Sequence, residues 1–256
     1  MMEDNKPKVS IITVCRNSEK TIERTIKSVL DQTYDNIEYI IIDGASSDHT
    51  MDIVRAYEKQ SGGRMRYISE KDDGIYYAMN KGIDMSSGDL IGIINSDDFY
   101  ESAAVETVVK NYDPQIRYQI LYGETRSLKD GREESVSIGS SEFIPERMIS
   151  HPACFITKDV YKDLGKYDTK YISAADYDFM LRMYYSKKVE FKEIYAIIVN
   201  FSLGGMCGSD AAYLDLLNLQ KNYGKISDGR YRWLIFKNRM YSLLVHHKMI
   251  RFKTGD

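Results

Sequence analysis

The chain has 256 residues, 43% of them apolar and 29% charged, a composition that excludes disorder as its main state and suffices for one α/β domain with an appendage. Its net charge of -3 hides an asymmetry, because residues 225–256 carry eight Lys or Arg against two Asp, while the preceding 224 residues sum to about -9. An acidic body argues against nucleic-acid binding, and the absence of an apolar run near the ~20 residues of a spanning helix argues against a transmembrane protein, so we expect a cytoplasmic location.

Strand and helix patterns alternate along the first 98 residues. The strands are short apolar runs between turn residues, and the first helix repeats its apolar residues at helical spacing after Ser18, a candidate N-cap. This alternation predicts a mainly parallel sheet with helices on both faces. The predicted elements are Val9–Val14, Glu19–Leu30, Ile37–Ile42, Thr50–Lys59, Arg66–Ser69, Ile75–Met85 and Leu90–Ile94.

The pattern is less regular after Asp98. We predict one α/β domain over residues 1–224, with halves 1–110 and 111–224, and a basic amphipathic helical tail over residues 225–256. The later elements are a helix near Ser102–Tyr112, a strand at Tyr118–Tyr122, a polar stretch at Ser127–Ser141, helices at Lys158–Leu164 and Asp176–Tyr185, a strand at Val189–Phe201, and two helices after Ser209.

Polar clusters follow three of the predicted strands. They are Thr13–Asn17, Asp43–Asp48 and Asn95–Asp98. Asp and Asn are common in ordinary turns, so one such cluster would carry little weight. The carboxyl ends of parallel strands share one edge of a sheet, where open α/β folds bind their ligands. Three clusters at that edge favour a ligand crevice over simple turns.

These segments resemble the glycosyltransferase family 2 proteins, which have the GT-A fold for nucleotide-diphospho-sugars. The matching segments are Val9–Asn17, Ile41–Thr50, Ser69–Glu70, Gly74–Tyr76, Ala78–Gly82, Ser87–Asp89, Asn95–Asp98, His151–Ala153, Gly165–Asp168, Ala174–Asp178 and Leu181–Arg182. The resemblance implies an inverting hexosyl- or N-acetylhexosaminyl-transferase. Such an enzyme moves a sugar from a UDP-sugar, or another nucleotide-sugar, to a hydroxyl of a saccharide or lipid-linked saccharide, as in bacterial surface polysaccharide synthesis.

The resemblance also suggests which residues bind the nucleotide. Asp43 is suited to accept the ring N–H of a uracil-like base, although a carboxylate here could also only cap the following turn. Thr13, Cys15 and Asn17 are expected to frame that pocket. Lys81 could contact a phosphate, with a solvated charge near a helix end as the equal alternative.

The cluster after the fourth predicted strand is the expected diphosphate and metal site. Asp97 is predicted to hold a divalent cation, Mn²⁺ or Mg²⁺, because such hard ions take carboxylate and phosphate oxygens. Asp98 would assist as a ligand or only support the turn. Asn95, in the place where the family has an aspartate, could meet the ribose, and Ser96 belongs to the same donor site.

The resemblance places the general base at Asp176, although an acidic residue in the first turn of a helix is common without any catalytic role. His151 is expected to line the acceptor cleft or contact the diphosphate, and a structural histidine explains it equally well. Gly205 lies in a glycine-dense segment that suggests a lid over the donor, with a flexible surface linker as the competing explanation. The three cysteines, Cys15, Cys154 and Cys207, lack a metal-ligand pattern, which predicts reduced thiols.

The basic tail mixes apolar and cationic residues from Arg230 to Phe252. It could lie on an anionic membrane, or dock on the chain's own domain or on a second subunit in a homodimer. Two rival functions stay open, a sugar nucleotidyltransferase and a non-catalytic nucleotide-sugar-binding protein. The first is disfavoured because Cys15–Glu19 after the first strand is not a glycine-rich phosphate loop.

Overall fold

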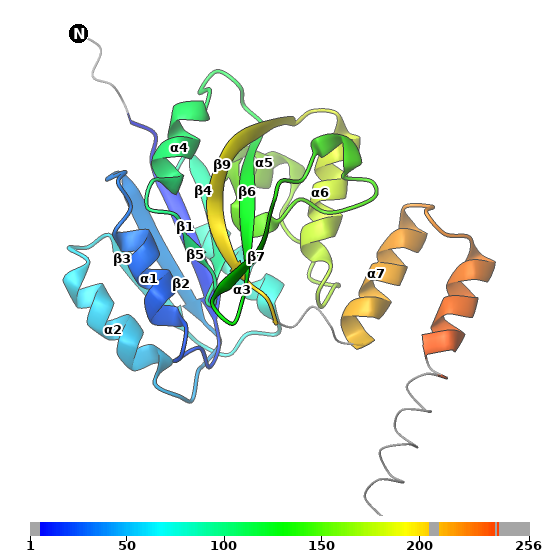
Figure 1. The fold of residues 1–256 in the computed structure, drawn as a ribbon, viewed down its shortest axis with the longest axis horizontal. Coiled ribbons are helices and arrows are strands. Elements are labelled where there is room, and N and C mark those ends of the chain that lie inside the picture. The colour runs from blue at the N-terminus through cyan, green and yellow to red at the C-terminus, as the bar shows by residue number, and fades with distance from the viewer. Residues whose placement is uncertain (1–5, 205–209, 239, 241–256) are drawn as a thin grey trace, which may run out of the picture. The chain divides into compact units, whose positions relative to one another are not determined.

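The computed structural model describes residues 6–204, 210–238 and 240, and the chain divides into two compact units (Figure 1). The first, called here the sheet unit, comprises Met1–Lys170 and Ala175–Gly204. The second, the helical unit, comprises Tyr171–Ala174 and Gly205–Asp256. The division at residue 224 stays a prediction.

The sheet unit is built on one nine-stranded sheet with the order β3-β2-β1-β4-β8-β6-β9-β5, and β7 pairs with β6. Pairing is parallel among β1 to β4, as the alternating pattern predicts. Beyond β4 the sheet is mixed, because β8 runs antiparallel to both its neighbours while β6 and β9 are parallel. The strands are β1 (Val9–Cys15), β2 (Ile37–Asp43), β3 (Met65–Ser69), β4 (Leu90–Asn95), β5 (Phe99–Tyr100), β6 (Gln119–Lys129), β7 (Arg132–Ser137), β8 (Cys154–Thr157) and β9 (Glu190–Ser202).

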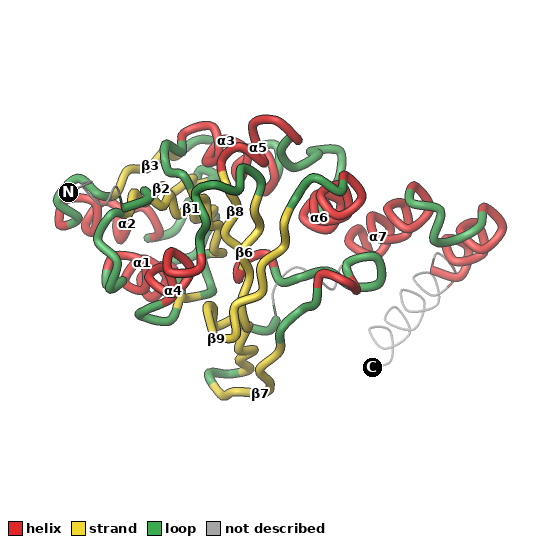
Figure 2. The backbone as a smooth tube through the Cα atoms, turned by 90° about the horizontal axis from the view of Figure 1, so that it is seen from above, coloured by secondary structure: helices red, strands yellow, loops and turns green. Residues whose placement is uncertain are grey.

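Helices cover both faces of this sheet, which confirms the predicted α/β class. Figure 2 shows α1 and α4 on one face and α3 and α5 on the other. The chain approaches closely where α3 crosses β1, since a Cβ on Gly82 would lie 2.5 Å from Ile12 Cγ2. The helices of this unit are α1 (Ile22–Leu30), α2 (Thr50–Gln60), α3 (Ile75–Met85), α4 (Ala104–Asn111), α5 (Lys158–Leu164) and α6 (Ala175–Ser186), with short 3₁₀ turns at Ser141–Phe143 and His151–Ala153.

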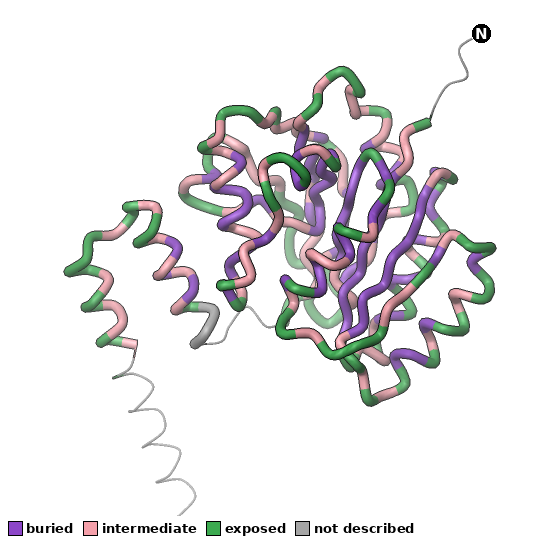
Figure 3. The backbone as a smooth tube through the Cα atoms, turned by 180° about the vertical axis from the view of Figure 1, so that it is seen from behind, coloured by how far each residue is buried: buried purple, intermediate pink, exposed green. Residues whose placement is uncertain are grey.

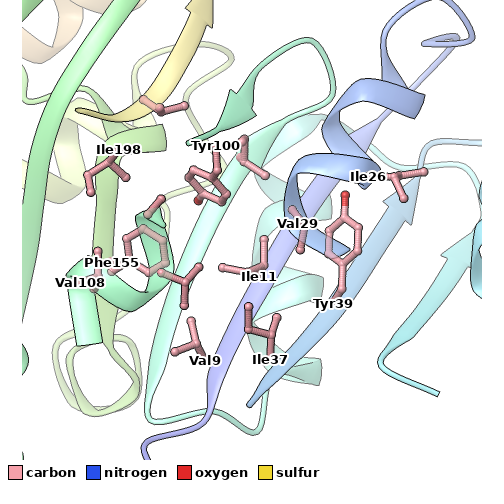
Figure 4. Packing of buried hydrophobic residues seen from close by; sticks show 14 of the residues in the cluster. Val9, Ile11, Ile26, Val29, Ile37, Tyr39, Tyr100, Val108, Phe155 and Ile198 are labelled. Carbon is pink, nitrogen blue, oxygen red and sulfur yellow. The ribbon is translucent and has the colours of Figure 1, made fainter. Parts of the chain in front are cut away.

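The hydrophobic core lies between the sheet and its helices, and burial follows the central strands (Figure 3). Ile11 and Ile37 meet Val29 of α1 from neighbouring strands, and Phe155 packs beside Tyr100 with ring centroids 5.6 Å apart (Figure 4). Burial of these side chains stabilises the sheet whose carboxyl edge carries the site loops. Cys15 and Cys154 are buried free thiols, as expected, and Cys207 lies outside the described residues.

Several elements differ from the sequence prediction. The polar stretch at 127–141 contains the end of β6 and all of β7, whose residues are exposed and therefore lack an apolar pattern. The short strand β5 is defined by its pairing with β9, and β8 by its pairing with β4 and β6. The sequence pattern therefore does not predict them. Helix α1 begins at Ile22 after Thr21, so the N-cap expected at Ser18 is wrong.

The helical unit contains α7 (Asp210–Asn222) and a helix of residues 228–238, which accord with the two helices predicted after Ser209. The Tyr231 hydroxyl joins them by donating to Asn218 Oδ1 at 2.7 Å. Asp215 of α7 accepts hydrogen bonds from the backbone N–H groups of Ile172 and Ser173, at 2.5 and 2.8 Å. Among the residues that the structure describes, no helix combines the length and the apolarity needed to cross a bilayer.

Candidate active site

The strand register brings the three polar clusters to one edge of the sheet, as predicted. Cys15 is paired with Asp43 across β1 and β2, and Asp43 with Ser69 of β3. Val14 is paired with Asn95 on the other side of β1. The loops that follow β1 and β4 also touch, because the hydroxyls of Ser18 and Ser96 are 2.8 Å apart.

Asp43 is fully buried at this edge and its carboxylate accepts hydrogen bonds from three neighbouring residues. Oδ2 accepts from Ser46 N–H at 3.0 Å and from the Ser69 hydroxyl at 2.7 Å. Oδ1 accepts from the Ser46 hydroxyl and from the Cys15 thiol, whose Sγ lies 3.6 Å away. Burial, with the charge of Asp43, raises the pKa of the Cys15 thiol, which therefore stays protonated. Asp43 thus orders the loops around it.

The loops after β1 and β2 hold each other in place. Asn17 has a left-handed backbone (φ 52°), and its Oδ1 accepts a hydrogen bond from Ser47 N–H at 2.9 Å. Ala45 is also left-handed (φ 55°), a conformation that glycine adopts with less strain. Thr13 lies deeper, fully buried, and its hydroxyl accepts from the Tyr39 hydroxyl at 2.9 Å. Asn17 is exposed at the rim of these loops, and the buried Thr13 supports the edge of the sheet from within.

The two adjacent aspartates after β4 have different surroundings. Asp97 is partly exposed, and among the described residues no group bonds to its carboxylate, while its backbone carbonyl accepts from Arg24 at 2.7 Å and from the Ser202 hydroxyl at 2.6 Å. Asp98 is fully buried, and accepts from Ser202 N–H at 2.8 Å on one oxygen and from Asn95 Nδ2 at 2.9 Å on the other. Asp98 thus fixes the turn, and Asp97 presents its carboxylate.

Burial raises the pKa of Asp98 to about 7, and the charge of Asp97 raises it further. The hydrogen bond from Ser202 N–H opposes this rise. The charge of His151 lowers the same pKa. The segment Asn95–Asp98 is called here the acidic turn.

Asp176 lies in the first turn of α6 and is held by three donors. The Tyr76 hydroxyl and the Tyr177 N–H donate to Oδ1 at 3.0 and 2.9 Å, and His151 Nδ1 lies 3.3 Å from Oδ2. Burial would raise the pKa of Asp176, but the hydrogen bond and charge of His151, helped by the other two donors, lower it. Asp176 is therefore ionised at neutral pH.

His151 contacts the Asp176 carboxylate from the segment just before β8. Its side chain is only 12% exposed, and Nε2 is buried with no hydrogen-bond partner among the described residues. Because a buried ring nitrogen without a partner costs free energy, this atom is available for an oxygen of a bound molecule. His151 and Asp176 come from two separate segments, and the fold brings them together.

Lys81 takes part in a pair of salt bridges instead of standing free. Its Nζ lies 2.5 Å from Glu70 and 2.6 Å from Asp72. Burial lowers the pKa of Lys81, but the bonds to these two carboxylates raise it by more. Contact with a phosphate would require one of these bonds to break. Gly205 lies outside the described residues, so its lid role stays a prediction.

Three residues at the site had no role in the sequence prediction. Tyr76 donates to Asp176, and Ser202 and Arg24 tie the Asp97 turn to the end of β9 and to α1. The Arg24 guanidinium also stacks over the Phe99 ring at 4.3 Å. Tyr76 stood within a matching segment, but a tyrosine at a helix start has no pattern that reveals its partner a hundred residues away.

The described residues contain no cluster of three or more His, Cys, Asp or Glu that could enclose a metal ion by themselves. A cation held at Asp97 would have to share its coordination with phosphate oxygens and water, which is the usual arrangement for Mg²⁺ on nucleotides.

A family model described as "Glycosyl transferase family 2" matches residues 10–162, which is more than half of the chain. The chain belongs to glycosyl transferase family 2. The match begins within β1, continues through β4, the acidic turn and His151, and ends within α5, before Asp176.

Two bacterial proteins are similar to this chain over most of its length. A PGL/p-HBAD biosynthesis glycosyltransferase of Mycobacterium bovis (strain BCG / Pasteur 1173P2) is 24% identical over 225 residues, which cover 85% of this chain and 87% of that protein. The chondroitin synthase of Escherichia coli is 30% identical over 257 residues, which cover 98% of this chain but 36% of the synthase.

Crystal structures of S. aureus TarS 1-349 have a similar fold. The complex with UDP-GlcNAc has a TM-score of 0.67 and 15% identity, and the match covers 88% of this chain and 69% of that one. The complex with UDP has a TM-score of 0.64 and 17% identity, over 83% of this chain and 63% of that one. At such identities the likeness shows the fold alone, and it confirms the expected GT-A architecture.

Proposed function

We propose that this family 2 chain moves a sugar from a UDP-sugar, or another nucleotide-sugar, to a hydroxyl of a saccharide or lipid-linked saccharide, with inversion at the anomeric carbon. The observation that carries the proposal is the bonding of Asp176, because three donors orient its carboxylate and leave Oδ2 a lone pair that can accept a proton. The names of the two relatives and the UDP-GlcNAc bound to TarS support a role in polysaccharide or glycolipid synthesis.

Asp176 is the proposed general base, acting through Oδ2. Oδ1 already accepts two hydrogen bonds, whereas Oδ2 meets only His151 among the described residues and keeps a lone pair for the acceptor hydroxyl. In the transfer step the acceptor oxygen bonds to the anomeric carbon while the bond from that carbon to the phosphate oxygen breaks. The hydroxyl proton passes to Oδ2, and the nucleoside diphosphate leaves. A single displacement from the opposite face inverts the anomeric configuration.

The acidic turn is the proposed diphosphate site. The Asp97 carboxylate fits a divalent cation because it is partly exposed and Arg24 and Ser202 fix its backbone. Bound Mn²⁺ or Mg²⁺ would supply Lewis-acid stabilisation of the charge on the leaving diphosphate. The described geometry favours Asp98 as support for the turn instead of as a direct ligand, since both its oxygens accept hydrogen bonds within the protein. His151 Nε2 would donate to a phosphate oxygen.

The loops after β1 and β2 are the proposed site for the nucleoside. A ring N–H of uracil would compete for Asp43 with the hydroxyls of Ser46 and Ser69, which can rotate away. Asn17 stands at the exposed rim of these loops, while Thr13 and Cys15 support them from below. Asn95 and Ser96 would meet the ribose side of the donor, and Lys81 would reach a phosphate only by leaving Glu70 or Asp72.

The test is metal-dependent UDP release, measured on a panel of UDP-sugars with and without saccharide acceptors. We expect acceptor-stimulated release that EDTA stops and Mn²⁺ or Mg²⁺ restores, and a product whose anomeric configuration, read by NMR, is opposite to that of the donor. Asp97→Asn should lower the rate by about 10- to 100-fold. Asp130→Asn, at an exposed turn between β6 and β7, is the matched control and should leave the rate unchanged.

Two rival functions give different results in the same assay. Donor binding without UDP release under any acceptor would favour a non-catalytic binding protein. Formation of a nucleotide-sugar from a sugar phosphate and a nucleoside triphosphate would favour a nucleotidyltransferase. Either result, or a product of retained configuration, contradicts the proposal.

A further inference from the structure

The helix of residues 228–238 carries large apolar side chains that its own unit leaves exposed. Trp233 and Phe236 are 58% and 63% exposed, and Met240, the next at helical spacing, is 42% exposed. Residues three and four apart lie on one side of a helix, so these three side chains form a single stripe, called here the Trp233 stripe. The other side of the helix contacts α7, where Tyr231 bonds to Asn218.

Cations flank the Trp233 stripe on both sides. Arg230, Arg232 and Lys237 are exposed, and the Lys237 ammonium lies 5.4 Å from the centre of the Trp233 ring. The sequence contains no Asp or Glu from residue 229 to residue 255, although the residues before 225 have a net charge of about -9. The only strongly basic part of the chain therefore coincides with exposed aromatic side chains.

We propose that the Trp233 stripe docks on an anionic lipid membrane surface. Aromatic side chains that enter the interface, with Lys and Arg beside them, are the arrangement by which amphipathic helices bind anionic lipids. A homodimer built on the same stripe is disfavoured, because a two-fold contact would bring like cations of both copies together. Docking here would hold the enzyme where lipid-linked acceptors reside, a benefit that goes beyond the transfer chemistry.

The experiment uses the full chain and its only tryptophan as the reporter. The emission of Trp233 is recorded with vesicles of phosphatidylcholine alone and with added phosphatidylglycerol. We expect a blue shift, and quenching by lipids brominated in the acyl chain, only with the anionic vesicles. High salt should weaken the binding, because the cations act through screened charge.

Two pairs of variants separate this surface from general charge and hydrophobicity. Arg230→Glu with Lys237→Glu should weaken vesicle binding about 30-fold. Lys59→Glu with Lys188→Glu makes the same charge change at exposed positions of the sheet unit and should weaken it far less. Phe236→Ser should reduce binding, whereas Tyr195→Ser, which changes an aromatic side chain of the sheet unit that is 79% exposed, should not.

Three results would overturn the proposal. They are an unchanged Trp233 emission with anionic vesicles, an equal loss of binding in both charge variants, and self-association of the protein that Phe236→Ser abolishes. The vesicle assay contains neither donor nor acceptor, so it can fail while sugar transfer stands. With a soluble acceptor, UDP release by the stripe variants should equal that of the unmodified chain.

Discussion

Two largely buried carboxylates differ in how many hydrogen bonds they accept. Glu38 lies near the amino-terminal edge of the sheet, and Asp176 lies beside the carboxyl-terminal edge. Glu38 Oε1 accepts from the hydroxyl of Ser10 at 2.5 Å, from the N–H and hydroxyl of Ser87 at 2.5 and 2.8 Å and from Gly88 N–H at 3.2 Å. Its Oε2 lies 3.2 and 3.3 Å from the cations of Arg66 and Lys8.

Asp176 has fewer donors, and one of its oxygens is only partly used. Three groups hold it, and Oδ2 has a single neighbour at 3.3 Å among the described residues. A carboxylate whose lone pairs are all bonded can only stabilise the fold, whereas one that is oriented but incompletely bonded can accept a proton from a ligand. The count of donors, more than burial, is what separates Glu38 from the proposed base Asp176.

The largest expected effect is the loss of transfer in Asp176→Asn. The amide keeps the size of the side chain and an oxygen for Tyr76 and Tyr177, but it is not a base. We expect the rate to fall by about 10³-fold while calorimetry shows an unchanged donor affinity and urea unfolding an unchanged stability. Full activity in this variant would show that another group takes the proton.

Glu38→Gln should affect stability instead of activity. Burial would raise the pKa of Glu38, but its hydrogen bonds with Ser10 and Ser87 and the charge of Lys8 lower it to about 2. The stability from this group is therefore complete above the unfolded pKa near 4.5 and is lost as the pH falls toward 2. We expect Glu38→Gln to lower the free energy of unfolding by about 3 kcal/mol at pH 7.

Urea unfolding at pH 7, 4 and 3 measures this effect. The difference between the unmodified chain and Glu38→Gln should shrink as the pH falls. Glu106→Gln, on α4, is the control and should have little effect, because its ion pair with Lys110 lies at the surface. A constant difference at all three pH values would contradict the assignment of the stability to the ionised Glu38.

The smallest expected effect is that of Tyr76→Phe, which removes one donor from Asp176. We expect kcat/KM to fall roughly tenfold, because a hydrogen bond to a charged group is lost. The pKa of Asp176 should rise, and since the base works unprotonated, the acid limb of the pH profile should move to higher pH. The titratable groups that face Asp176 are His151, Tyr76 and Tyr167, and His151 remains in place.

Tyr161→Phe is the matched control for Tyr76→Phe. It removes a hydroxyl from the same aromatic cluster, 3.5 Å from the Tyr167 hydroxyl, without a described contact to Asp176. Its pH profile should not move. An equal shift in both variants would mean that packing, and not the hydrogen bond, sets the effect of Tyr76.

Local patterns were enough to predict much of the fold. The apolar runs of β1, β2 and β4 and the helical spacing in α1 depend on neighbouring residues, so periodicity revealed them. Strands β5, β7 and β8 are short or fully exposed and exist because of their partners, so no local pattern predicts them.

The sequence by itself determined the family, the sheet of the first half and the edge at which Asp43 and Asp97 stand, because strand polarity alone brings carboxyl ends together. Only the tertiary structure decided that Asp98 is buried and bonds to Ser202 while Asp97 stays partly exposed, and that Tyr76 and His151 hold Asp176. Those facts depend on contacts between residues far apart in the chain, whose direction no spacing in the sequence encodes.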